Sequence, residues 1–220
     1  MTAAANFDRL ARWYRWLEYA AFGGALERCR FVLLPELAAA RRVLVLGEGD
    51  GRFLQELLAA NPRARVDVVE ASAKMLDLAC GRLTVRQRAR VKFNLADARS
   101  WDFPEAEYDA VVTCFFLDCF TPETLAELMP RISRSAAPGA SWLLAEFAES
   151  TSLRSQVWLG AMHAFFRATT CLEARRLAPF ADLLSSGGWG RLRQVAGAGG
   201  LISAELWREC FSQNETKIVD

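Results

Sequence analysis

43-VLVLGEGDGRF-53 is the stretch on which the fold of this chain depends. Four apolar residues, two of them β-branched, predict a buried parallel strand, and a helical apolar period restarts at Phe53. Three glycines alternate between the two elements: Gly47, Gly49 and Gly51. A glycine can adopt a positive φ and leaves room for ligand atoms, while the first helical turn offers free N–H groups. The stretch therefore predicts a ligand-binding turn at the carboxyl end of a strand, the alternative being a glycine turn without a ligand.

The spacing of the glycines indicates which ligand to expect. A dinucleotide-binding G-x-G-x-x-G would need a small residue at position 52, where this chain has Arg52, so a dehydrogenase is disfavoured. A hydrophobic strand followed by G-x-G-x-G resembles the first motif of the class I S-adenosylmethionine-dependent methyltransferases. That family often has an acid two positions before the first glycine; this chain has Val45 there and Glu48 inside the turn. The resemblance implies that S-adenosyl-L-methionine binds at Gly47, Glu48, Gly49 and Gly51.

Two further acids follow predicted strands. The strand at 66–69 ends in Glu70, at about the spacing from the glycine turn where nucleotide-binding folds place an acid on the ribose hydroxyls. We assign Glu70 and its neighbour Ala71 to the cofactor site. The resemblance implies that Asp97, after the third strand, accepts a hydrogen bond from the adenine amino group beside Ala98; the alternative is a solvated turn. Met75 either lies on the adenine face or belongs to the core.

The fourth predicted strand and its exit span 108–120, where the sequence resembles the family's F-D-x-V-V-x-x-x-x-L-H-H segment. We assign Thr113 in this strand to the cofactor site. Relatives often carry His-His where this chain has Asp118-Cys119. Asp118 either orients or deprotonates a substrate, or caps the helix that starts near Thr121. After the fifth strand, Glu146 is expected near the substrate entrance.

The first 22 residues predict an aromatic helix over 6–22, which could pack on the sheet, cover the active site as a lid, or lie in a membrane interface. Its start, 7-FDRLARWY-14, resembles the F-D-x-[IL]-A-x-x-Y opening of quinone-biosynthesis C-methyltransferases. That resemblance implies that Tyr14 is a lid contact in the site.

Residues 151–172 form an aromatic segment that is either a structural helix or an inserted substrate-binding helix. It contains the chain's only histidine, His163, which is either a packing residue or a general base near neutral pH. An apolar or aromatic acceptor would lie among Tyr14, Trp158, Phe165 and Phe166.

Composition limits the function classes. The chain has 220 residues, a net charge of +1 and 52% hydrophobic residues, so a large core is available and no basic face for nucleic acid is indicated. Its six widely spaced cysteines and single histidine predict neither disulfides nor a metal site. With no integral membrane segment and no signal-peptide pattern, we expect a cytoplasmic protein, monomeric or homodimeric.

Together these patterns predict a single α/β domain over 1–220. It would be a Rossmann-like, doubly wound, seven-stranded sheet, mostly parallel, with a C-terminal antiparallel hairpin and N-terminal lid helices. We expect a lid at 6–34, a cofactor-binding core at 41–147, a substrate-side insertion at 151–172, and a closing helix and hairpin at 174–209. The predicted function is methyl transfer from S-adenosylmethionine to a small molecule by in-line displacement. The alternative is a non-catalytic cofactor-binding or partner-binding module.

Overall fold

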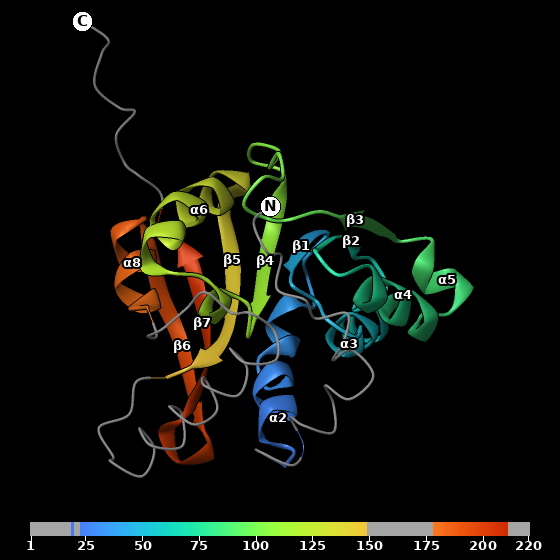
Figure 1. Ribbon diagram of the computed structural model, residues 1–220, viewed down its shortest axis with the longest axis horizontal. Coiled ribbons are helices and arrows are strands. Elements are labelled where there is room, and N and C mark those ends of the chain that lie inside the picture. Colours follow the sequence, from blue (N-terminus) through green and yellow to red (C-terminus); the bar gives the residue numbers. More distant parts are fainter. Residues whose placement is uncertain (1–18, 20–22, 149–177, 211–220) are drawn as a thin grey trace, which may run out of the picture.

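The protein, seen here in a computed structural model, is built on one seven-stranded sheet with the order β3-β2-β1-β4-β5-β7-β6 (Figure 1). The structure describes Tyr19, residues 23–148 and residues 178–210. The first five strands are parallel, and β7 is antiparallel to both β5 and β6. The predicted mostly parallel sheet with a closing hairpin is therefore confirmed. The strands are β1 (Arg42–Leu46), β2 (Arg65–Glu70), β3 (Val91–Leu95), β4 (Tyr108–Cys114), β5 (Ala136–Phe147), β6 (Trp189–Gly197) and β7 (Ile202–Glu209).

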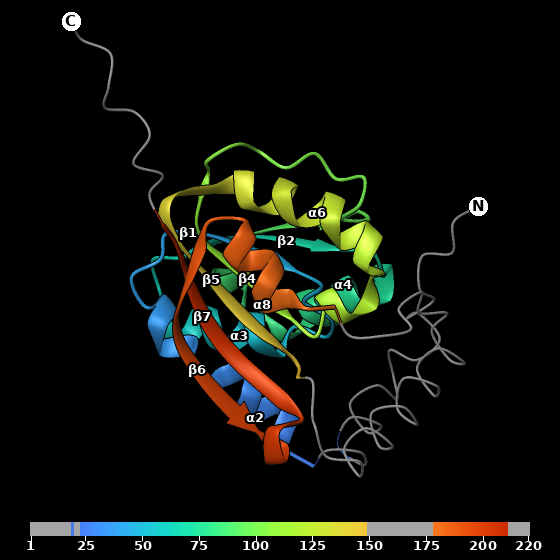
Figure 2. The ribbon, with the colours of Figure 1, turned by 90° about the vertical axis from the view of Figure 1, so that its left-hand side faces the viewer.

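Helices cover both faces of this sheet, as Figure 2 shows edge-on. One hydrophobic cluster joins the sheet to α2, η2 and α3, and a second joins the opposite face to α6 and α8. In β1, Val43 and Val45 belong to the first cluster, while Leu44 and Leu46 belong to the second. An unbroken apolar strand is what burial on both faces requires. The helices are α2 (Ala25–Phe31), α3 (Arg52–Ala60), α4 (Ala73–Arg82), α5 (Val85–Arg88), α6 (Pro122–Ser135) and α8 (Phe180–Ser186), with short 3₁₀ helices η2 (Leu34–Leu37), η3 (Leu117–Cys119) and η4 (Ala198–Gly200).

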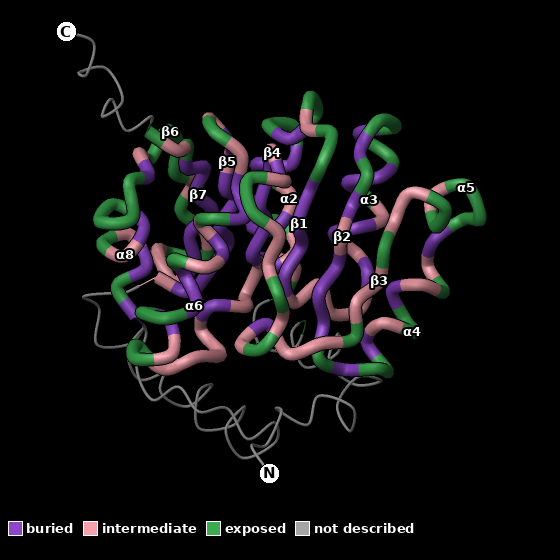
Figure 3. The backbone as a smooth tube through the Cα atoms, turned by 90° about the horizontal axis from the view of Figure 1, so that it is seen from above, coloured by how far each residue is buried: buried purple, intermediate pink, exposed green. Residues whose placement is uncertain are grey.

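Burial is deepest in the middle of the sheet and falls toward its two edges (Figure 3). Four of the five residues of β1 are buried, whereas β3 has none and β6 has only Trp189. Sites that need exclusion from water are therefore best placed at the ends of the central strands β1, β4 and β5.

Two local expectations were wrong. A proline followed by a glycine predicts a turn before the fifth strand, but Pro138-Gly139 lies inside β5, where the pairing with β4 shifts register between Tyr108 and Ala110. Gly139 has φ +75° and donates its N–H to Glu209, so the strand passes through a bulge instead of ending. The helix α5 was not predicted at all, although Thr84 and Gln87 form a capping box at its start.

The N-terminal region is described from α2 onward. The expected helix up to Leu33 ends at Phe31, and Pro35 then lies in the first turn of η2. Both elements pack on the same sheet face as α3. The expected helix at 6–22 lies outside the described residues apart from Tyr19. Within the described part of the chain, no helix has the length and apolarity that crossing a membrane demands.

Candidate active site

The candidate site lies at the carboxyl ends of β1, β2, β4 and β5. The chain order reverses between β1 and β4, since β2 and β3 lie on one side of β1 and β4 and β5 on the other. In open α/β sheets, ligands bind at such a switch point. The loops that follow these strands therefore decide what the site can do.

The glycine turn after β1 provides room for a ligand at one of its three glycines. Gly47, Gly49 and Gly51 all have positive φ, at +65°, +68° and +86°. A Cβ on Gly47 would lie 2.3 Å from Phe116 Cδ2, and one on Gly51 would lie 2.4 Å from Ala79 Cα. At Gly49, in contrast, no described atom comes within 4 Å of that position. Gly47 and Gly51 are therefore required by packing, and the loop is open at Gly49.

Glu70, at the end of β2, holds this turn in place. Its Oε2 accepts a hydrogen bond from Gly49 N at 3.1 Å, and its Oε1 accepts one from Ser72 N at 2.9 Å. The carboxylate is 9% exposed. Ser72 in turn caps α4, accepting from Met75 N. Glu70 thus fixes the open part of the glycine turn, and a carboxylate is also a suitable acceptor for ribose hydroxyls.

Glu48 has a different role from that of Glu70. Its Oε1 accepts a hydrogen bond from Leu54 N at 2.9 Å, which satisfies a free N–H in the first turn of α3. Burial raises the pKa of Glu48 to about 8, with the neighbouring Asp50 and Glu70 adding to the rise while the Leu54 N–H and Arg30 oppose it. This carboxyl is therefore mostly protonated at neutral pH without a ligand.

Asp97 lies beside Glu70, because β3 pairs with β2 and Ala96 N donates to the Glu70 carbonyl at 3.1 Å. The Asp97 carboxylate is paired with Arg99, whose Nη2 lies 2.6 Å from Oδ2. Hydrogen bonds from the Arg99 side chain lower the pKa of Asp97. Its neighbour Ala98 is buried in the second cluster. The two predicted acids thus share one end of the sheet, and Asp97 is ionised.

The other predicted cofactor contacts differ in their accessibility. Ala71 is exposed at the turn after β2, and the Met75 side chain is buried in the first turn of α4. Thr113 is fully buried, and its hydroxyl accepts a hydrogen bond from Trp142 Nε1 at 2.9 Å. The core therefore uses the Thr113 side chain, and its role at the cofactor stays a prediction.

The exit of β4 carries the predicted acid Asp118 into the site. Phe115 has φ +52°, which a bulky residue rarely adopts, and its N–H donates to the Ala145 carbonyl. The next two N–H groups, of Phe116 and Leu117, donate to Glu146 Oε1 at 2.9 and 2.8 Å. Glu146 thereby fixes the turn from which η3 and Asp118 follow.

Asp118 does not cap the helix that follows it. Thr121 is the N-cap of α6, since its Oγ1 accepts from Thr124 N at 3.3 Å. Asp118 Oδ1 instead lies 3.7 Å from the Cys119 thiol, which donates to it. Burial raises the pKa of Asp118 to about 6, and burial together with the Asp118 charge raises that of Glu146. The capping alternative is therefore wrong, which leaves Asp118 available for chemistry.

Sequence reasoning missed one basic residue at this edge. Arg30, in α2, is buried, and its guanidinium carbon lies 5.0 Å from the centroid of the Phe115 ring. Its charge lowers the pKa values of Glu48 and Asp118. No motif points to it, because an arginine in a short helix resembles a solvated one until the helix is placed on the sheet.

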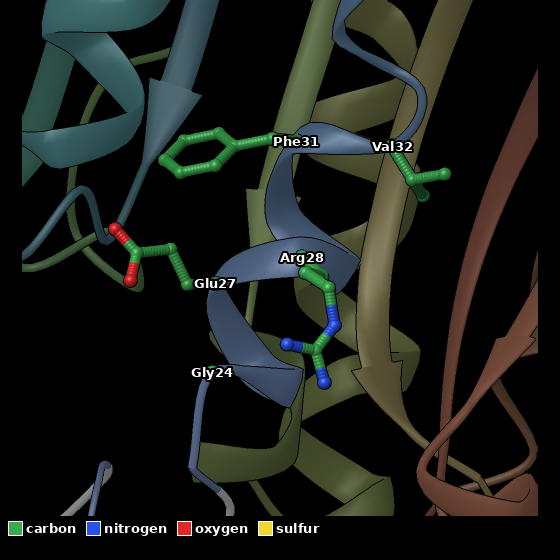
Figure 4. Close-up of a pocket in the computed structure, with 5 residues that line it drawn as sticks. All are labelled: Gly24, Glu27, Arg28, Phe31 and Val32. Atoms are coloured by element: carbon green, nitrogen blue, oxygen red, sulfur yellow. The ribbon is translucent and has the colours of Figure 1, made fainter.

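A surface pocket of the described chain lies beside α2 and is lined by Gly24, Glu27, Arg28, Phe31 and Val32. Figure 4 shows Glu27 and Phe31 pointing to one side of α2, with Arg28 and Val32 on the other. Phe31 stacks on Phe53 at 6.4 Å between ring centroids, which places this pocket next to the start of α3. The predicted site residues Tyr14 and His163 lie outside the described residues, as do Trp158, Phe165 and Phe166.

Candidate metal ligands do not cluster in the described part of the chain. Within residues 23–148 and 178–210, no group of three or more His, Cys, Asp or Glu side chains is placed to hold a metal ion.

Comparison with known proteins finds methyltransferases among the similar proteins. A family model described as a methyltransferase domain matches residues 43–139. The demethylmenaquinone methyltransferase of Deinococcus radiodurans is 33% identical over 109 residues, covering 49% of this chain and 43% of the relative. The ubiquinone/menaquinone biosynthesis C-methyltransferase UbiE of Syntrophotalea carbinolica is 30% identical over 148 residues, covering 66% of this chain and 61% of the relative. The matches thus span about half the length of these relatives.

Solved structures show the same fold. Human N-acetylserotonin methyltransferase, solved in complex with SAM, is 20% identical with a TM-score of 0.63, covering 83% of this chain and 52% of that one. The 1,6-didemethyltoxoflavin-N1-methyltransferase of Burkholderia thailandensis, solved with S-adenosylhomocysteine, is 18% identical with a TM-score of 0.67, covering 94% and 87%. The predicted Rossmann-like architecture is thereby confirmed. These matches support a class I S-adenosylmethionine-dependent methyltransferase, which the chain resembles most directly over residues 43–139.

Proposed function

We propose that this protein transfers a methyl group from S-adenosylmethionine to an apolar or aromatic small-molecule acceptor by in-line displacement. The observation that carries the proposal is the glycine turn, open at Gly49 and tied through that residue's N–H to the Glu70 carboxylate. A turn of this form beside a strand-end acid suits a nucleoside with ribose hydroxyls. The names of the relatives, all methyltransferases, support an enzyme over a non-catalytic module.

The residues of the site fit the parts of this ligand. Glu70 would accept from the ribose hydroxyls, Asp97 would receive the adenine amino group, and Gly49 leaves space for the chain between them. When bound, S-adenosylmethionine supplies a methyl group already activated by a positively charged sulfur. The protein then mainly has to align the acceptor with that methyl group and exclude water. The deep burial at the ends of β4 and β5 supports such exclusion.

The remaining expectations belong to this proposal. An aromatic acceptor among Tyr14, Trp158, Phe165 and Phe166 rests on the sequence alone, as does the role of His163 as a base. A small-molecule substrate without nucleic acid, a monomeric or homodimeric state and a cytoplasmic location are likewise proposed. Deleting the imidazole by His163→Ala should lower turnover by about 10²-fold if His163 is the base.

Calorimetric titration with S-adenosylmethionine, and separately with NADH, tests the cofactor. We expect micromolar binding of the first, lost on Glu70→Ala, and no binding of the second. Glu36→Ala, which removes a surface partner of Arg193, is a matched control that should keep full affinity. Binding of NADH in place of S-adenosylmethionine would overturn the proposal.

A further inference from the structure

Among the described residues, only one of the two carboxyl oxygens of Glu146 accepts hydrogen bonds. Glu146 ends the deeply buried part of β5 and is 2% exposed. Its Oε1 accepts from two backbone N–H groups, those of Phe116 and Leu117. Its Oε2 is buried and has no hydrogen-bond partner among the residues that the structure describes. A buried polar atom without a partner is costly, so this oxygen needs either a proton or a ligand.

The same two hydrogen bonds position Asp118 relative to the carboxyl group of Glu146. They fix the turn directly before Asp118, which Phe115 enters with a left-handed backbone. Strained backbone of this kind is kept where the surroundings enforce it, often at functional sites. Asp118 also receives the Cys119 thiol, so one of its oxygens is already oriented. Burial and the charge of Asp118 raise the pKa of Glu146, whereas the backbone N–H groups of Leu117, Phe116 and Asp118 lower it.

We propose that Glu146 and Asp118 share one proton and handle the hydrogen that the methyl acceptor must lose, with Asp118 as the base and Glu146 as its positioning residue. This inference rests on the proposed methyl transfer and narrows its acceptor to molecules that lose a proton on methylation, among which we commit to hydroxyl-bearing aromatic ones. Glu146 keeps the proton on Oε2 and Asp118 is ionised. The protonated Oε2 then donates to Asp118 or to the acceptor oxygen.

The proton balance defines this substrate class. As the acceptor oxygen bonds to the methyl carbon, the carbon–sulfur bond breaks and its electron pair stays on sulfur. The hydroxyl proton goes to the Asp118 carboxylate and later to water. A thiolate acceptor has no proton to lose and would not need the pair. A fold-only role for Glu146 would need just the Oε1 acceptor, which a glutamine also provides.

Other charged and titratable groups face the pair from the packed elements. Arg30 from α2 favours the ionised form of Asp118, whereas the thiol pKa values of Cys29, Cys114 and Cys119 are raised, so these neighbours are neutral near pH 7. Two further acids contribute to the raised thiol pKa values: Glu48 to that of Cys114 and Glu70 to that of Cys119. Two buried acids acting on each other disfavour a double negative charge, so the pair is expected to retain one proton.

The decisive measurement is a pH titration of the ligand-free protein by NMR, with ¹³C-labelled Asp and Glu carboxyl carbons. We expect one carboxyl of the pair to titrate near pH 6 and the other well above the ordinary range of a glutamate. Asp118→Asn and Glu146→Gln should each remove one of these two titrations. Glu205→Gln, which alters a buried glutamate of β7, should leave both unchanged. Full ionisation of both carboxyls below pH 5 would overturn the inference.

Activity supplies a second, separate readout with two probe acceptors, catechol and 4-chlorobenzenethiol. Asp118→Asn should lower turnover of catechol by about 10²-fold and leave that of the thiol, which ionises without help, within about threefold. Glu146→Gln should keep most catechol turnover but alter its pH profile, whereas Glu146→Ala should lose it. Equal losses with both acceptors, or no catechol turnover despite normal S-adenosylmethionine binding, would contradict the assigned substrate class. Failure of S-adenosylmethionine binding itself would instead overturn the proposed function.

Discussion

Glu70 and Glu146 lie at the carboxyl ends of β2 and β5, on the same edge of the sheet, but their carboxyl groups are hydrogen-bonded in different ways. Glu70, in the cofactor half, accepts backbone N–H groups on both oxygens. Glu146, in the acceptor half, gathers two N–H groups on one oxygen and leaves the other buried without a described partner. The first arrangement places a hydrogen-bond donor on each oxygen, and the second fixes the position of a carboxyl while favouring its protonated form. The same residue type thus suits binding in one half and proton handling in the other.

The largest effect is expected from Gly47→Ala, which disrupts the contact between the glycine turn and Phe116. The new methyl group would meet the Phe116 ring, and alanine would have to adopt φ +65°. We expect a loss of about 3 kcal/mol in the free energy of unfolding, measured by denaturant titration. Gly49→Ala, with similar φ but open space, should lose only about 1 kcal/mol while weakening cofactor binding. Equal losses would show that Phe116 yields freely.

A glutamine scan compares the two acids directly. Glu70→Gln leaves one acceptor oxygen for the N–H groups of Gly49 and Ser72, so the affinity for S-adenosylmethionine should fall about 30-fold, or about 2 kcal/mol. Glu146→Gln keeps its one used acceptor and should change that affinity less than threefold. Calorimetry measures both. A reversed order would mean that the halves have been assigned to the wrong ligands.

Thr113→Val tests whether this side chain serves the core or the cofactor. Valine fills the same space but leaves the buried Trp142 indole N–H without its acceptor. We expect a loss of about 1.5 kcal/mol in unfolding free energy, with unchanged affinity for S-adenosylmethionine. A drop in affinity at unchanged stability would instead place the hydroxyl on the ligand.

The pH dependence of stability tests the raised pKa values of the buried carboxyl groups. The folded protein holds protons on Glu48 and Asp118 up to pH values of about 8 and 6, above those of the unfolded chain. Stability of the ligand-free protein should therefore decrease as pH rises through about 4 to 8, where the unfolded chain loses these protons before the folded protein does. Thermal unfolding at pH 5 and pH 8 measures it, and Glu48→Gln should flatten the slope. A rise in stability over this range would contradict the protonated carboxyls.

The sequence predicted the sheet because its signals are local. The apolar run before Gly47, the cap at Ser72 and the strand end at Glu70 each depend on neighbouring residues and needed no tertiary information. The bulge at Gly139 was missed because a proline and a glycine also suit a turn, and only pairing with β4 distinguishes the two.

Only the part of the candidate site around Glu70 and Asp97 could be predicted from the sequence. Motif spacing located Glu70 and Asp97, whereas the hydrogen bonds of Glu146 join residues 30 positions apart. Arg30 likewise reaches Phe115 only after α2 packs on the sheet. Contacts of this range depend on topology, which spacing along the chain does not encode.

Phe116 links the glycine turn after β1 to the turn after β4, from which Asp118 follows. Its ring packs on Gly47, and its backbone N–H belongs to Glu146. Any shift of the first turn on cofactor binding would displace the second, so the two ligands should influence each other's affinity by the same factor. Such reciprocity favours an ordered cycle, in which the acceptor binds tightly only after the methyl donor is in place.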